Sequence, residues 1–285
     1  MTTSASTQPP VPDVALLDGT AVPQLGLGVY KVDDDDDGAR DAVATALAAG
    51  YRLVDTARLD GNEVGVGRAL RESGIPREEL HVTTKVWNDD QGRERTLRAF
   101  DASVARLDVG APDLYLIHWP CAGRDLYVET WQTLVGLRED GRVRSIGVSN
   151  FQPAHLTRIV EDSGVVPVLN QVELHPYLQQ RALREHHARL GVATQAWAPL
   201  GAGNGVLADP VIVSVARRHR VTPAQVVLRW HLDLGTLVIP KSVTPGRIRE
   251  NVDVFGFELT DEDHRLVAGL DRGERVGPDP DVLGA

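Results

Sequence analysis

The chain has 285 residues, of which 42% are hydrophobic and 25% charged, with a formal net charge of −10 and one cysteine. The acidic balance argues against nucleic acid and anionic membranes as partners, because both attract basic surfaces. No apolar stretch approaches the roughly 20 residues of a membrane-spanning helix. A single cysteine allows no internal disulfide, so we expect a cytoplasmic protein.

Residues 1–13 lack the basic start and apolar run of a signal peptide, and we expect them to form a flexible N-terminal tail. Residues 14–17 and 21–23 flank Asp18-Gly19, which predicts a two-residue β-hairpin turn. Beyond the hairpin, short apolar strands alternate with amphipathic helices. The expected strands are 25–28, 52–55, 80–85, 114–118, 145–148, 168–173, 193–197 and 237–240. The expected helices include 39–49, 64–73, 96–107, 126–140, 154–163, 180–190, 223–234, 244–254 and 261–270.

Eight strands, each followed by a helix, indicate parallel pairing through right-handed crossovers. We therefore predict an α/β fold, a (β/α)8 TIM barrel with an N-terminal β-hairpin, that forms one domain over residues 14–285. The rival is an open doubly wound sheet, which would carry a glycine-rich phosphate loop after its first strand. Only Gly26-Leu27-Gly28 occurs there, without a third glycine at the right spacing.

The predicted strands end in polar or aromatic residues rather than in ordinary turns. These residues are Asp55, Lys85, His118, Ser149, Asn150, Gln171, Trp197 and Lys241. Each has a structural explanation by itself: Asp55 as a helix cap, His118 as a core histidine, Lys85 as half of a surface ion pair. Together they favour a site, because the carboxyl ends of barrel strands share the face that carries the active site.

The residue types at these strand ends indicate a chemistry. An Asp–Lys pair in a water-poor pocket places a cation beside the reacting centre and tunes a neighbouring proton donor, and a histidine polarises a carbonyl oxygen. We expect no metal, because His118 has no second histidine or cysteine at ligand spacing. His186-His187 is interpreted as part of a solvated helix face, and the acidic run 33–37 as a solvated first helical turn.

A second group of polar residues lies where the last strand meets a helix. Lys241, Ser242, Thr244 and Arg247 combine two cations and two hydroxyls with a helix N-terminus, which binds phosphate. Loops after the last strands are the usual phosphate site of a barrel. Only three residues of the chain are lysines, and two of them, Lys85 and Lys241, lie in these two groups. The pattern suits the 2′-phosphate of NADPH.

At this point the chain resembles the aldo-keto reductase family, in particular its prokaryotic 2,5-diketo-D-gluconate-reductase-like members, from about residue 14 to about residue 280. The resemblance rests on Leu25-Gly26-Leu27-Gly28-Val29-Tyr30, Asp55-Thr56-Ala57, Gly61-Asn62-Glu63, Thr84-Lys85-Val86-Trp87-Asn88, Asp113-Leu114-Tyr115-Leu116-Ile117-His118-Trp119-Pro120, Gly147-Val148-Ser149-Asn150-Phe151, Asn170-Gln171-Val172-Glu173 and residues 241–251.

This resemblance implies an oxidoreductase that transfers hydride from NADPH to the carbonyl (C=O) carbon of a small molecule; a C=N carbon is the alternative that the departure described below raises. Apart from the resemblance, we expect a monomer. The resemblance also implies that Asp55, Lys85 and His118 occupy three of the four catalytic positions. The cofactor contacts it implies are Gly28, Val29, Asp55, Ser149, Asn150, Gln171, Trp197, Lys241, Ser242, Val243, Thr244, Arg247, Glu250 and Asn251. The substrate-pocket residues it implies are Tyr30, Trp87 and Trp119.

The fourth catalytic position departs from the family, because Asp60 occupies the place of the tyrosine that donates a proton. The flanking motif is intact and ungapped on both sides. An aspartic acid has an unperturbed pKa of about 3.9, and a neighbouring lysine lowers it, so we expect Asp60 to be ionised at neutral pH.

Asp60 allows three interpretations. In the first, Asp60 and Glu63 form a helix capping box, and the protein binds NADPH with weak or lost reductase activity. In the second, carbonyl reduction persists, with His118 or a water held by Asp60 supplying the proton. In the third, the substrate is an imine or iminium, whose carbon accepts hydride without an acid and whose charge the anionic Asp60 attracts. Substrate choice is expected to depend on residues 121–125, 201–209 and 271–285. The first two of these loops are short and indicate an open site.

Overall fold

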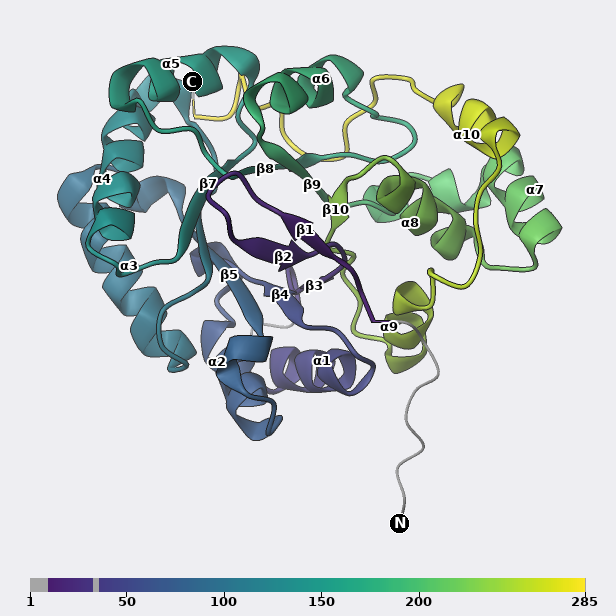
Figure 1. Cartoon of the computed structure of the whole chain (residues 1–285), viewed down its shortest axis with the longest axis horizontal. Helices are drawn as coiled ribbons and strands as arrows, with labels where there is room; N and C mark the ends of the chain where they lie inside the picture. The colour runs from purple at the N-terminus through teal and green to yellow at the C-terminus, as the bar shows by residue number, and fades with distance from the viewer. Residues whose placement is uncertain (1–9, 33–35, 285) are drawn as a thin grey trace.

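The computed structural model describes residues 10–32 and 36–284 (Figure 1). Most of the acidic run 33–37, and residues 1–9 of the predicted tail, lie outside the described residues. The N-terminal hairpin pairs β1 (Asp13–Ala15) with β2 (Ala21–Pro23), so β1 begins one residue inside the predicted tail. The prediction of a two-residue turn was wrong. Residues 17–19 form a three-residue loop closed by Leu16 N–H donating to Thr20 O, because Gly19 takes the left-handed conformation of a bulge.

Eight parallel strands come after the hairpin, and each overlaps one of the eight predicted segments. They are β3 (Leu27–Gly28), β4 (Leu53–Asp55), β5 (His81–Val86), β6 (Leu114–Ile117), β7 (Ser145–Ser149), β8 (Leu169–Glu173), β9 (Ala193–Trp197) and β10 (Leu237–Val238). Neighbours in sequence are neighbours in the sheet. Parallel bridges from Leu25 to Val238 and from Gly28 to Lys241 join β3 to β10, which confirms the predicted barrel.

Helices surround this sheet on its outer side (Figure 1). They are α1 (Asp36–Ala48), α2 (Glu63–Glu72), α3 (Arg93–Leu107), α4 (Tyr127–Glu139), α5 (Pro153–Ser163), α6 (Arg181–Leu190), α7 (Pro210–His219), α8 (Pro223–Asp233), α9 (Pro245–Val252) and α10 (Asp261–Ala268). Short 3-10 helices are η1 (Arg58–Asp60), η2 (Arg77–Glu79), η3 (Asn88–Asp90), η4 (Ala122–Arg124), η5 (Gly201–Gly203) and η6 (Val206–Ala208). Among the described residues, no helix is long and apolar enough to cross a membrane.

Helix α7 was missing from the prediction, although its start carries a strong local signal. Asp209 accepts a hydrogen bond from Val211 N–H, and Pro210 occupies the first helical position, where its missing N–H costs nothing. The interpretation of His186-His187 as a solvated face was wrong for His187. That ring is fully buried and is hydrogen-bonded to the side chains of Asn170 and Thr194.

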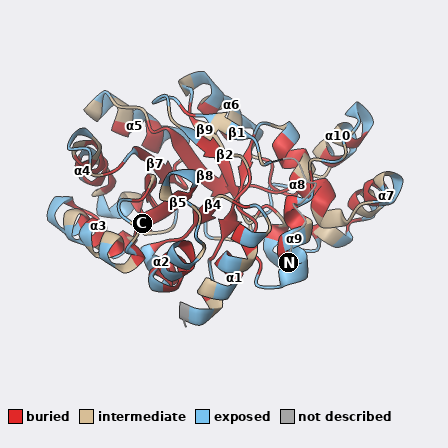
Figure 2. Cartoon of the chain, turned by 60° about the horizontal axis from the view of Figure 1, so that its bottom comes forward, coloured by how far each residue is buried: buried red, intermediate tan, exposed pale blue. Residues whose placement is uncertain are grey.

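Apolar side chains from the hairpin fill the N-terminal end of the barrel. Leu16 and Val22 form one buried cluster with Leu53, Leu114 and Leu237 of the strands. The buried residues concentrate in the sheet and on the inner faces of the helices, as Figure 2 shows. Because the N-terminal end is closed in this way, a site within the barrel opens at the carboxyl ends of the strands.

Candidate active site

A buried ion pair lies at the carboxyl ends of neighbouring strands β4 and β5. Lys85 Nζ donates to Asp55 Oδ1 at 2.5 Å and to Thr56 O at 3.0 Å, and both ionic side chains are only 4% exposed. The second carboxylate oxygen of Asp55 accepts from Gln171 Nε2 at 2.7 Å. Burial raises the pKa of Asp55, and Lys85 opposes that rise. The same Gln171 amide also donates to Gln195 Oε1 at 2.7 Å, a residue the sequence analysis missed because it lies inside β9 rather than at its end.

Asp60 is brought to this pair by the 3-10 turn η1, which ends at Gly61 in the left-handed conformation. Asn62 fixes the turn from both sides, since it accepts from Thr56 Oγ1 at 2.9 Å and donates to Val29 O at 3.0 Å. The capping-box interpretation was wrong. Helix α2 begins at Glu63 with Asn62 as its cap residue, and no side chain makes a cap hydrogen bond there.

Glu63 serves a different purpose from the predicted cap. It is buried, accepts from Thr84 Oγ1 at 2.6 Å and pairs with Arg106 at 2.6 Å. It therefore ties α2 to β5 and α3, and it contributes a negative charge close to Asp60. Glu63 belongs to Gly61-Asn62-Glu63, the intact part of the family motif that follows Asp60.

The environment of Asp60 is unfavourable to the ionised form that was predicted for this side chain at neutral pH. Asp60 is 8% exposed, and its Oδ1 is buried without a hydrogen-bond partner. Burial raises the pKa of Asp60 to about 7; Lys85 lowers it, and the negative charges of Asp55 and Glu63 raise it further. The sequence analysis gave Lys85 the decisive weight, but loss of hydration is the larger effect here. Asp60 is therefore protonated in a substantial fraction of molecules at neutral pH.

His118 lies just after β6 and is half-buried, with its Nδ1 buried and without a partner. The rings of His118 and Trp87 meet edge-to-face with centroids 5.1 Å apart. Burial, with a smaller effect of Lys85, holds the pKa of His118 well below its usual range. The ring is therefore neutral at physiological pH. A neutral imidazole donates a hydrogen bond to an oxygen but is a poor source of a proton.

Residues in the carboxyl-terminal parts of β7, β8 and β9, together with Asn150, form one hydrogen-bonded chain. Ser149 Oγ donates to Gln171 O at 2.8 Å, and Asn150 Nδ2 donates to His118 O at 3.0 Å. Trp197 Nε1 donates to Asn150 Oδ1 at 2.8 Å. Asn150 has φ 64°, a left-handed conformation that asparagine tolerates better than most residues. This chain brings together Ser149, Asn150, Gln171 and Trp197, four of the predicted cofactor contacts.

Residues 241–251 run along the seam where β3 and β10 meet. Gly28 pairs with Lys241 here, and a side chain at Gly28 would lie 2.8 Å from Ile239 O, so the seam requires a glycine. The seam places Gly28 and Val29 beside the predicted phosphate site. Lys241 and Arg247 are exposed, and neither forms an ion pair with a described residue.

The remaining members of this segment differ in exposure. Val243 is 49% exposed and Thr244 is exposed as well, whereas Ser242 and Asn251 are buried. Ser242 Oγ accepts from Thr244 N–H at 3.1 Å. Glu250 accepts from Thr222 Oγ1 at 2.8 Å, which ties α9 to the start of α8. Two unpaired cations thus stand at the start of α9 on a fixed turn.

The predicted substrate residues lie around the same end of the barrel. Trp119 is 7% exposed and meets Trp197 edge-to-face with centroids 6.4 Å apart. Tyr30 lies after β3, is 53% exposed and has the Lys31 ammonium 5.2 Å from its ring centroid. Trp87, which follows β5, lies against His118.

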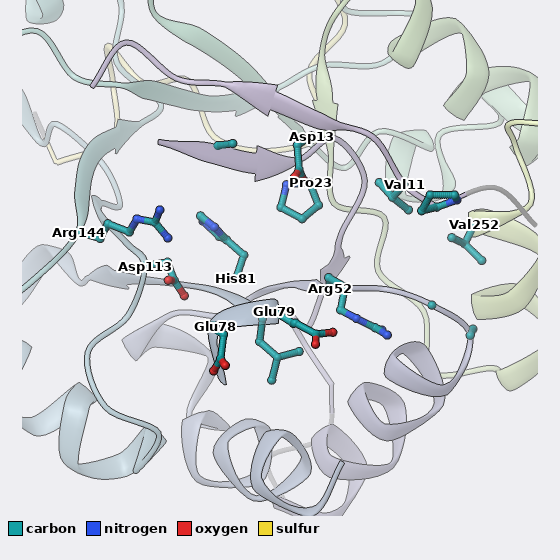
Figure 3. A pocket seen from close by; sticks show the side chains of 15 residues that line it. Val11, Asp13, Pro23, Arg52, Glu78, Glu79, His81, Asp113, Arg144 and Val252 are labelled. Carbon is teal, nitrogen blue, oxygen red and sulfur yellow. The ribbon is translucent and has the colours of Figure 1, made fainter. Parts of the chain in front are cut away.

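Two cavities lie at the opposite, N-terminal end of the barrel. One, of about 610 Å³, is bounded by the hairpin and the residues that precede β4 to β7, with His81 and Arg144 facing each other across it (Figure 3). The second, of about 570 Å³, lies beside Leu17 and Arg138. Neither cavity is lined by a predicted site residue.

The chain is similar to known proteins over most of its length. A family model described as the aldo/keto reductase family matches residues 24–272. An aldo-keto reductase of Mycolicibacterium smegmatis is 54% identical over 94% of this chain and 97% of its own length. The methylglyoxal reductase DkgA of Yersinia pestis is 48% identical over 96% of this chain and 98% of its own length. A solved structure of a Gox0644 variant in complex with NADPH superimposes with a TM-score of 0.91 at 50% identity, covering 95% of this chain and 98% of that one.

Proposed function

From the premise that this chain belongs to the aldo/keto reductase family, we propose that it reduces small aldehydes and ketones with NADPH and that Asp60 supplies the proton. Relatives at 48% identity are named methylglyoxal reductases, which favours small, reactive carbonyl compounds as substrates. The observation that carries the proposal is the burial of Asp60, which is 8% exposed and has one side-chain oxygen without a hydrogen-bond partner. Burial raises its pKa to about 7, which allows an aspartic acid to replace the tyrosine as a general acid.

NADPH, when bound, supplies the hydride. The residues of the chain fit this cofactor on two counts. The unpaired cations of Lys241 and Arg247 at the start of α9 match the charge of a 2′-phosphate. At the other end, Gln171 makes both of its side-chain hydrogen bonds to described residues through Nε2, so its Oε1 is left to accept from a carboxamide. We propose that Ser149, Asn150 and Trp197 hold that end.

Asp60 acts in its neutral form. As negative charge develops on the substrate oxygen, the carboxylic acid releases its proton, and the product is an alcohol. The proton passes through one water molecule, because aspartate is shorter than tyrosine by roughly one ring. Lys85 then stabilises the aspartate that remains, and solvent reprotonates it for the next turnover.

His118 and Asp55 have supporting parts in this proposal. Neutral His118 donates a hydrogen bond to the substrate oxygen and orients the carbonyl group. Asp55 holds the Lys85 ammonium by the 2.5 Å contact and is itself oriented by Gln171. The helix-cap role that the first interpretation gave Asp60 is absent, because no side chain caps α2.

A second substrate class is favoured by the orphaned Oδ1 of Asp60. Above pH 7 this buried oxygen belongs to an anion without a hydrogen-bond partner, and a cationic iminium carbon next to it is stabilised by charge. An iminium ion accepts hydride without a proton donor. We therefore propose that imine reduction dominates over carbonyl reduction on the alkaline side of the Asp60 titration.

A substrate panel over a pH series tests both proposals. NADPH consumption is measured with methylglyoxal, an aromatic aldehyde, a ketone and a cyclic imine from pH 5.5 to 9. We expect carbonyl turnover to fall as pH rises through about 7 and Asp60→Asn to lose about 10²- to 10⁴-fold of it. Asp89→Asn, at an exposed carboxylate, is the matched control. Carbonyl turnover that is flat across pH 7 and unaffected by Asp60→Asn would refute Asp60 as the acid.

A further inference from the structure

Glu173 ends β8 as a fully buried carboxylate to which the proposed function gives no part. Its Oε1 accepts from Val276 N–H at 2.6 Å and lies 3.0 Å from His175 Nε2, and its Oε2 accepts from Gly277 N–H at 3.0 Å. Burial raises the pKa of Glu173, but these hydrogen bonds outweigh it and leave the pKa lowered. A buried carboxylate is tolerated only with such partners. Two of them come from a segment more than 100 residues away in sequence.

That segment is the C-terminal tail, residues 271–284, which runs from α10 to the opposite side of the barrel (Figure 1). The backbone N–H groups of Arg272 and Glu274 donate to Tyr177 O at 3.1 and 3.2 Å. Beyond Gly277, the hydrogen bonds of the tail with described residues stay within the tail and are accepted by Asp279. Glu173 is therefore the last group outside the tail that hydrogen-bonds it, among the described residues.

The pair of hydrogen bonds presses Gly277 against the proposed nicotinamide site. A side-chain carbon at Gly277 would lie 2.4 Å from the Trp197 ring and 3.1 Å from Glu173 Oε2. Trp197 in turn donates to Asn150 and meets Trp119 edge-to-face. At the far end of the tail, a side chain at Gly284 would lie 2.9 Å from Cys121, which lies after β6. The tail thus passes from the end of β8 to the end of β6.

We propose that Glu173 is a positioning residue that latches the C-terminal tail against Trp197 and so builds one wall of the substrate pocket. The effect on substrates rests on the proposed function, whereas the latch itself does not. Because the tail beyond Gly277 has no other hydrogen bond to the barrel among the described residues, loss of this carboxylate releases residues 276–284 together. Residues 271–274 stay in place through Tyr177. Release of residues 276–284 opens the pocket wall beside Trp197 and Trp119, where a substrate larger than methylglyoxal would extend.

Hydrogen exchange on the free protein tests the latch without cofactor or substrate. Glu173→Gln replaces one acceptor oxygen by a donor that faces a backbone N–H. We expect amide exchange in residues 276–284 to rise at least tenfold, with no change in residues 271–274. Glu274→Gln, which removes an exposed tail carboxylate, is the matched control and keeps wild-type exchange. Unchanged protection of residues 276–284 in Glu173→Gln would overturn the proposal.

Kinetics test the consequence with variants that leave the buried carboxylate intact. Gly277→Ala forces the tail off Trp197, and a chain ending at Arg275 removes the latched part. Both are expected to raise the KM for an aromatic aldehyde about tenfold, with kcat and the NADPH Kd changed less than threefold and the KM for methylglyoxal nearly constant. These two variants also test the pocket wall if Glu173→Gln fails to fold. Equal KM values in all variants would overturn the assigned wall, and absence of all turnover in wild type would instead refute the proposed function.

Discussion

The ammonium of Lys85 donates to Asp55 at 2.5 Å and forms no ion pair with Asp60 within the described residues. The positive charge of Lys85 is therefore neutralised mainly by Asp55, the carboxylate that it contacts directly. Asp60 receives only the weaker, longer-range part of the positive charge, which is too little to offset its burial. This division makes one aspartate a permanent partner of the lysine and leaves the other poised to exchange a proton.

Replacing Lys85 by Met tests that division. Because Lys85 lowers the pKa of Asp60, its loss moves the pKa above 7, and the alkaline fall of carbonyl turnover moves with it. Asp55 also loses its partner, so the maximal rate is expected to drop about 10²-fold or more. The measurement is kcat/KM against pH with methylglyoxal. Lys31→Met is the control, since Lys31 is exposed and outside the pair, and an unshifted profile in Lys85→Met would argue against this coupling.

Restoring the family residue with Asp60→Tyr is expected to raise aldehyde reduction at pH 8 about 10- to 100-fold. The phenol reaches the substrate oxygen without a water, and its unperturbed pKa of about 10 keeps it protonated there. Imine turnover is expected to fall, because the buried anion is gone. Initial rates with both substrate classes at pH 6 and 8 check this prediction. Faster imine reduction in Asp60→Tyr would contradict the proposed part of the anion.

We expect the preference for NADPH over NADH to depend on Lys241 and Arg247. Lys241→Ala and Arg247→Ala are each expected to weaken NADPH binding about 10- to 100-fold, as loss of a charge-assisted hydrogen bond does. NADH, which lacks the 2′-phosphate, is expected to change less than about threefold. Fluorescence titration with both cofactors makes the comparison, with the exposed Arg249→Ala as control. Equal losses for NADPH and NADH would remove the 2′-phosphate assignment.

The sequence was sufficient for the strands and for the polar residues at their carboxyl ends, because the strands are short apolar runs and the polar residues follow them directly. It was insufficient for the state of Asp60. The sequence motif shows that Lys85 and Glu63 are charged residues near Asp60. The loss of water around Asp60, by contrast, depends on how η1 folds onto β4 and β5. The latch of Glu173 on Gly277 was beyond reach for the same reason, since no local pattern joins residues so distant.

The burial of Asp60 also has a measurable effect on stability. Its folded pKa of about 7 exceeds an unfolded value of about 3.9, so ionisation opposes folding. The penalty is absent below about pH 4, grows as pH rises, and levels off above about pH 7 at roughly 4 kcal/mol or less. Asp60→Asn removes the titration, so its free energy of unfolding relative to wild type is expected to increase from pH 4 to 7 and then stay constant. Urea unfolding at pH 4, 5.5, 7 and 8.5 measures this difference. A difference that is constant over that range would mean that Asp60 is ionised throughout, and the tyrosine position would then hold no acid.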